Sequence, residues 1–113
     1  MKFYKKLLLL VLFSPNVFSS ELDGSAESIV TRVVSYNEYG AGDVQFWIAN
    51  PTTKCQGYWI TKGDPGFSAN LSMIIAALQA KTHVVVHAHS SEAERWKGST
   101  GHFCKLHSLD LRG

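Results

Sequence analysis

The sequence predicts a mainly β domain with one α-helix, in the order three strands, helix, two strands. Three observations predict this fold class: stretches of β-branched residues separated by turn residues, one apolar run at helical spacing, and alternating residues after that run. The 113 residues suffice for one domain with a modest hydrophobic core.

Three strands are expected before the helix. Residues 29–36 are rich in β-branched side chains, and the turn residues 39–43 separate them from a second strand at 44–49. The Asn-Pro pair at 50–51 favours another turn, because Pro cannot donate to a strand ladder. A third strand is therefore expected at 57–61.

The helix is expected to run from Pro65 or Phe67 to Ala80. Asp64 before Pro65 suits an N-cap followed by the first helical position. The apolar residues then fall on one helical face: Phe67, Leu71, Ile74, Ile75 and Leu78.

Two strands follow the helix. Residues 82–89 alternate, with Val84, Val86 and Ala88 on one face and His83, Val85, His87 and His89 on the other. A polar loop at 90–101 leads to a last strand at 102–111. This order matches a five-stranded Greek-key barrel of the oligonucleotide/oligosaccharide-binding (OB) type, with its helix between strands three and four.

Residues 1–19 have the pattern of an export signal. Lysines near the start precede an apolar run at 7–13 and a segment of small residues, so cleavage is expected before Ser20. The apolar run is shorter than the roughly 20 residues that a membrane span requires. We therefore expect a periplasmic or secreted protein with no membrane span in the mature chain, a flexible leader at 20–27 and one domain at 28–113.

Removal of the signal changes the charge. The full chain has a formal charge of +2, but without Lys2, Lys5 and Lys6 eight Lys and Arg face nine acidic residues. The mature chain is near −1, and its basic residues are scattered. This argues against nucleic acid as a partner, because nucleic acid requires a clustered basic face.

The chain has two cysteines, Cys55 and Cys104, so one intramolecular pairing exists. In an exported protein a disulfide is the expected state. Closing a loop of this length would stabilise the fold by about 4 kcal/mol in the chain-entropy model. A shared metal site and two free thiols are the alternatives.

The strand order, the lone helix, the following strand at 82–89 and the C-terminal Cys104 together resemble a known family. Over residues 29–111 the chain is similar to the exported OB-fold B subunits of bacterial AB-type toxins, most nearly those of subtilase cytotoxin and pertussis toxin. The resemblance implies a homopentameric ring that binds sialylated or other cell-surface glycans. It transfers no binding residue to this chain.

A second resemblance rests on short segments. CQGYWI at 55–60, DPGF at 64–67 and WKGSTGHFC at 96–104 resemble small uncharacterised exported bacterial proteins. This resemblance implies no activity.

Aromatic residues supply the candidate ligand contacts. Exposed Trp or Tyr would stack on sugar rings, whereas buried ones would fill the core. Tyr58 and Trp59 are strand neighbours, so they should point in opposite directions. Trp96 lies in a polar loop and is expected to be exposed. These three residues are the ligand-binding candidates.

His87 and His89 are the metal candidates, because their spacing on one strand face can present two imidazoles to one ion. A zinc site would require further ligands that the sequence does not place. The favoured interpretation is a solvent-facing strand that carries histidines, with no metal and no cofactor.

Catalysis finds no support in the sequence, which contains no Gly-x-Ser-x-Gly, His-Glu-x-x-His or phosphate-loop motif. We therefore expect an exported, non-catalytic binding module. Its expected partners are a cell-surface glycan and either copies of itself or an exported partner protein. The alternatives are a periplasmic metal-binding protein that uses the strand histidines and a structural subunit of a larger exported complex.

Overall fold

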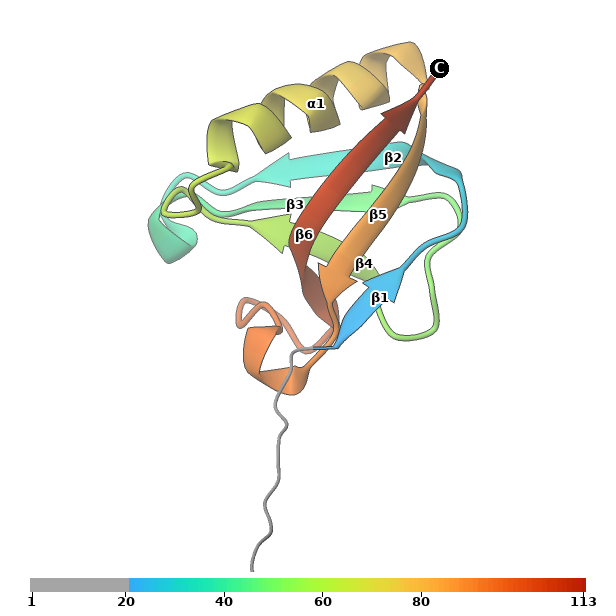
Figure 1. The fold of residues 1–113 in the computed structure, drawn as a ribbon. Helices are drawn as coiled ribbons and strands as arrows, with labels where there is room; N and C mark the ends of the chain where they lie inside the picture. The colour runs from blue at the N-terminus through green and yellow to red at the C-terminus, as the bar shows by residue number, and fades with distance from the viewer. Residues whose placement is uncertain (1–20) are drawn as a thin grey trace, which may run out of the picture.

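The computed structural model describes residues 21–113, which form six β-strands, one α-helix and two short 3-10 helices (Figure 1). The strands are β1 (Leu22–Gly24), β2 (Ser28–Ser35), β3 (Val44–Ile48), β4 (Gly57–Ile60), β5 (His83–His89) and β6 (Phe103–Arg112). The helices are α1 (Phe67–Ala80), η2 (Tyr39–Ala41) and η3 (Glu92–Glu94). The predicted class, mainly β with one helix, is confirmed. The predicted export signal and its cleavage point lie outside the described residues.

The strands form one mixed sheet that contains a ring of hydrogen bonds. The ring runs from β2 to β3, β4, β6 and β5, and returns from β5 to β2. The closing contact is short and joins Ser28 and Ile29 of β2 to Val84 and His83 of β5. All pairings are antiparallel except that of β4 with β6, which is parallel.

Helix α1 covers one end of this ring, where it packs against β2 and β6 (Figure 1). Ile74 and Ala77 are its buried residues, and Phe67, Leu71 and Leu78 are partly buried against the core. The apolar face predicted by the helical spacing therefore faces the sheet, although Ile75 at the margin of that face is exposed.

The core fills the inside of the ring and follows the period of two along each strand. Val84, Val86 and Ala88 of β5 are buried, as their alternation predicts. Phe46 of β3 and Tyr58 of β4 pair across the sheet, and their ring centroids lie 5.2 Å apart. Both side chains are fully buried, so the neighbouring Trp47 and Trp59 point outward and remain partly exposed.

The first described residues differ from the prediction of a flexible leader at 20–27. Leu22–Gly24 form β1 and pair with β5 from His87 to His89. Ser25 extends this contact: its backbone N–H donates to Val86 O, and its Oγ accepts from Val86 N. The sequence of this polar segment, which contains one glycine, does not predict a strand. The segment is ordered because it pairs with the edge of β5.

Asp64 also differs from its predicted role. Gly66 is the N-cap of α1, and it makes no side-chain capping hydrogen bond. Asp64 Oδ2 instead accepts from Thr61 N at 2.9 Å, and its Oδ1 forms an ion pair with Lys105 Nζ at 2.9 Å. Asp64 therefore fixes the turn after β4 and links it to β6.

The predicted disulfide between Cys55 and Cys104 is present, with 5.5 Å between the two Cα atoms. It lies beside the parallel pair, where Tyr58 is opposite Cys104. Within residues 21–113, no helix combines the length and the apolar character that a membrane crossing requires.

Candidate ligand-binding face

Two loops and three strands form an aromatic face on the outside of the ring. The loops are residues 36–43, between β2 and β3, and residues 90–102, between β5 and β6. The strands are β3 and β4, which present Trp47 and Trp59 outward, and β6, which begins at Phe103. We call this surface the aromatic face. Its members are Tyr36, Tyr39, Trp47, Trp59, Trp96 and Phe103.

Trp96 lies where the two loops meet. Its ring centroid is 5.3 Å from those of Tyr36 and Tyr39 and 6.1 Å from that of Phe103. Its Nε1 donates a hydrogen bond of 2.8 Å to Asp43 Oδ2. Trp96 is only 4% exposed, so the prediction of an exposed loop tryptophan is wrong. The physical reason is that the opposite loop supplies three aromatic or acidic partners that the local sequence does not reveal.

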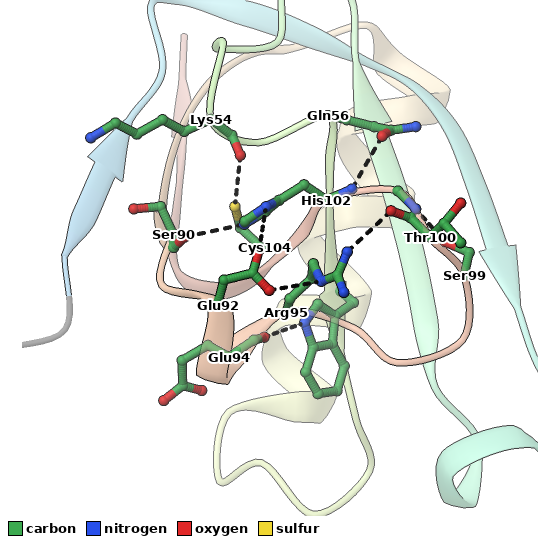
Figure 2. Close-up of polar contacts among 12 residues, drawn as sticks. Lys54, Gln56, Ser90, Glu92, Glu94, Arg95, Ser99, Thr100, His102 and Cys104 are labelled. Atoms are coloured by element: carbon green, nitrogen blue, oxygen red, sulfur yellow. Dashed lines mark hydrogen bonds and ion pairs between the residues drawn. The ribbon is translucent and has the colours of Figure 1, made fainter.

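The loop of Trp96 is held by its own polar contacts, which Figure 2 shows. Arg95 Nη1 donates to Thr100 O at 3.1 Å, and Arg95 Nε lies 3.4 Å from Glu92 Oε1. His102 Nε2 donates to Ser90 O at 3.1 Å, which closes the base of the loop. The loop therefore has a defined shape around the buried indole.

The first pocket on this face has a volume of about 310 Å³, and we call it the Arg32 pocket. The Arg32 guanidinium lies 4.4 Å from the Trp47 ring centroid, a cation–π contact. Other lining residues are Tyr36, Tyr39, Gln45, Trp96, Gly98, Ser99 and Phe103. The pocket thus combines flat aromatic walls with a cationic donor.

The second pocket has a volume of about 470 Å³, and we call it the Asp43 pocket. Its lining residues are Tyr39, Gly40, Asp43, Trp59, Thr61, Trp96 and Lys97. Trp59 is fixed at its indole, since Nε1 donates to Glu94 O at 3.0 Å and Lys105 Nζ lies 4.4 Å from the ring centroid. Tyr39 and Trp96 line both pockets and separate them.

Asp43 is the buried charged residue of this face, at 3% exposure. Its Oδ2 accepts from Trp96, whereas its Oδ1 has no hydrogen-bond partner among the described residues. The carboxylate lies against Gly40, where an added Cβ would come within 2.2 Å of Oδ2. Gly40 has a φ of +60°, so the turn requires glycine both for its backbone and for this close approach.

The structure separates the three predicted ligand contacts. Trp59 lines the Asp43 pocket, and Trp96 is the buried wall between the pockets. Tyr58 lines neither of these pockets, because its side chain points into the core. Burial, and secondarily the negative charge of Asp23, raise the pKa of the Tyr58 hydroxyl from 10.0 to about 12.

The strand histidines lie elsewhere on the surface. The rings of His89 and His107 meet edge to face with centroids 5.3 Å apart, and His87 lies against Gly24. His83 Nδ1 is 3.1 Å from Glu27 Oε1. Among residues 21–113, no three His, Cys, Asp or Glu side chains are arranged to hold a metal ion.

Arg32, Asp43 and Lys97 are site residues that the sequence did not single out. Each is an ordinary charged residue in a strand or turn, and no motif surrounds it. The sequence contains no local signal for Arg32 and Asp43, because only the folded chain brings them beside Trp47 and Trp96. Comparisons with protein-family models, curated proteins and solved structures found no match to this chain.

Proposed function

We propose that this chain is an exported, non-catalytic binding module of the OB type that recognises a glycan on its aromatic face. The ring order and the position of α1 between β4 and β5 support the OB assignment. If β2 is counted as the first strand of the barrel, the second and third strands and the two loops used by that fold supply most of both pockets, and Arg32 of the first strand and Phe103 of the fifth complete the Arg32 pocket.

The observation that carries the glycan proposal is the pair of adjoining pockets with aromatic walls and a few polar groups. Pyranose rings have one apolar face that stacks on Trp or Tyr, while their hydroxyls require hydrogen-bond partners. Arg32 and Gln45 offer such partners in one pocket, and Asp43 and Thr61 offer them in the other. The two volumes together suit a ligand of more than one sugar.

Export is part of the same proposal. The disulfide supports it, because disulfides persist mainly in oxidising compartments. Amino-terminal sequencing of the protein recovered outside the cytoplasm tests it, with Ser20 as the expected first residue. An unprocessed product retained in the cytoplasm would contradict export.

A glycan array with the disulfide-bonded mature protein tests the binding proposal. We expect binding that is lost in Trp47→Ala and weakened in Arg32→Ala, since both residues form the wall of the Arg32 pocket. Arg112→Ala is the matched control, because Arg112 is an exposed arginine that lines neither pocket. No binding by folded protein in any assembly state would overturn the proposal. The solution mass tests the expected self-association.

A further inference from the structure

The Asp43 pocket contains an unsatisfied hydrogen-bond acceptor beside an aromatic cavity. Asp43 is more than nine-tenths buried, and its Oδ1 has no partner among the described residues. A buried polar atom without a partner is costly, and such atoms are uncommon in native proteins. Tyr39, Trp59 and Trp96 line the same pocket. A ligand that enters this pocket and donates to Oδ1 would remove the cost.

We propose that the Asp43 pocket binds one sugar ring that carries no carboxylate, through a hydroxyl that donates to Asp43, and that Asp43 is thereby the specificity-determining residue of the face. This inference rests on the proposed glycan-binding function. It adds the charge class of the sugar, the pocket that receives it and the atom that selects it.

The buried charge in the pocket selects against acidic sugars. An ionised carboxylate accepts hydrogen bonds but cannot donate them, so Asp43 repels a carboxylated sugar and attracts a donor. Lys97 also lines the pocket, but its side chain is exposed, so its charge is screened by solvent. A ring with hydroxyl donors and no carboxylate meets this condition.

The aromatic walls supply the apolar contact. Trp59 is held from two sides by Glu94 O and Lys105, so its ring is a rigid surface. Tyr39 is partly exposed and lies at 71° to the Trp96 ring. The volume of about 470 Å³ lies in the usual range for ligand pockets, about 300–1,000 Å³.

The chain has three tryptophans, and their indole N–H signals report on different parts of the aromatic face. Trp59 reports the Asp43 pocket, Trp47 the Arg32 pocket, and Trp96 both. We would titrate the 15N-labelled mature protein with methyl glucoside, methyl galactoside and methyl mannoside, and separately with glucosamine and glucuronic acid. A neutral glycoside is expected to shift the Trp59 and Trp96 indole signals, with a weaker effect from glucuronic acid.

Asp43→Asn is the decisive variant. Its amide oxygen keeps an acceptor for Trp96 Nε1, while its NH2 group replaces the unpartnered acceptor in the pocket. We expect the affinity for the neutral glycoside to fall about ten-fold or more, because the ligand hydroxyl loses its charged acceptor and meets an NH2 donor instead. An unchanged Trp96 indole signal in the free variant shows that the wall is intact. Asp110→Asn, an exposed site on β6, is the charge-matched control.

A second variant tests the charge argument without touching a buried residue. Lys97→Gln should leave the affinity for the neutral glycoside within about two-fold, and glucuronic acid should remain the weaker ligand, because the buried Asp43 sets the preference. A neutral-glycoside affinity that falls about ten-fold would assign the selection to Lys97 and overturn the role of Asp43.

The failures of the two proposals are distinguishable. Preferential binding of glucuronic acid, an undiminished affinity in Asp43→Asn, or shifts confined to Trp47 would overturn the Asp43 inference. Glycan-array binding that depends on Arg32 and Trp47 would then still support the proposed function. An array without binding, together with a titration without shifts, would overturn both.

Discussion

Trp96 Nε1 donates to Asp43 Oδ2 across 53 positions of sequence, and this hydrogen bond joins the two loops of the aromatic face. Both residues are buried, and Tyr36 and Tyr39 pack against the indole from the first loop. The two pockets therefore depend on one contact between segments that are distant in the sequence.

Replacing Trp96 with Phe tests the energetic weight of this contact. The variant keeps an aromatic ring but leaves both oxygens of the buried Asp43 carboxylate without a donor, so we expect a loss of about 1–3 kcal/mol in the free energy of unfolding. Urea denaturation measures the loss. Trp47→Phe is the control, because Trp47 is partly exposed, and its loss should be smaller. Equal losses would contradict the prediction.

Gly57 of β4 lies close to the ring of Phe103. A Cβ at this position would lie 2.6 Å from Phe103 Cε2 and 3.1 Å from Phe46 O, so something must move to accommodate it. We expect Gly57→Ala to lower the free energy of unfolding by about 1–3 kcal/mol. Gly63→Ala provides the comparison, since its added Cβ would have no neighbour within 4 Å among the described residues other than those adjacent to it in the chain. A thermal melt in which both variants match the wild type would refute this account.

Tyr58 makes the free energy of unfolding depend on pH in the alkaline range. Because burial raises its pKa from 10.0 to about 12, the unfolded chain loses this proton more readily than the folded chain. The contribution of the protonated Tyr58 to the free energy of unfolding is complete below pH 10, and it decreases by about 2 kcal/mol as the pH rises toward 12.

Tyr58→Phe should remove this part of the alkaline decline. At neutral pH the variant should be as stable as the wild type or up to about 1 kcal/mol more stable, because the removed hydroxyl has no hydrogen-bond partner among residues 21–113. Denaturation curves at pH 7 to 12 give the comparison. Tyr39→Phe retains Tyr58 and should keep the decline, and a Tyr58→Phe profile identical to the wild type would be inconsistent with the raised pKa.

The disulfide between Cys55 and Cys104 closes a loop with a sequence separation of 49 residues. Replacing both cysteines with Ala should lower the free energy of unfolding by about 4 kcal/mol, mainly because the unfolded chain regains entropy. Urea denaturation of this variant and of the reduced wild type should agree. A loss below about 1 kcal/mol would show that the loop constraint contributes little.

Much of the fold followed from local pattern. Five strands and the helix lie within one or two residues of their predicted bounds, because alternation and helical spacing directly reflect which side chains face the core. Strand β1 was missed because Leu22–Gly24 are ordered by the edge of β5 rather than by their own residues. Asp64 was misassigned because Thr61 N and Lys105, its actual partners, compete with the helix end.

The site was less predictable than the fold. Trp59 could be identified because Tyr58 and Trp59 must face opposite sides of a strand. Asp43 and Arg32 acquire their roles only through the ring, which brings Trp96 and Trp47 beside them. Trp96 is buried rather than exposed for the same reason, because the sequence of a polar loop does not show which other loop packs against it.

The parallel pairing of β4 with β6 has a consequence for when the domain can form. Its two strands are separated in sequence by α1 and β5, so it carries a larger loop-closure cost than the neighbouring hairpins. The disulfide covalently links the segment just before β4 to β6, beside this parallel pairing. We therefore expect the reduced chain to favour an opened sheet and oxidation to complete the ring. Under the proposed export, such coupling would keep the sheet open until the chain reaches an oxidising compartment, and the aromatic face would assemble only there.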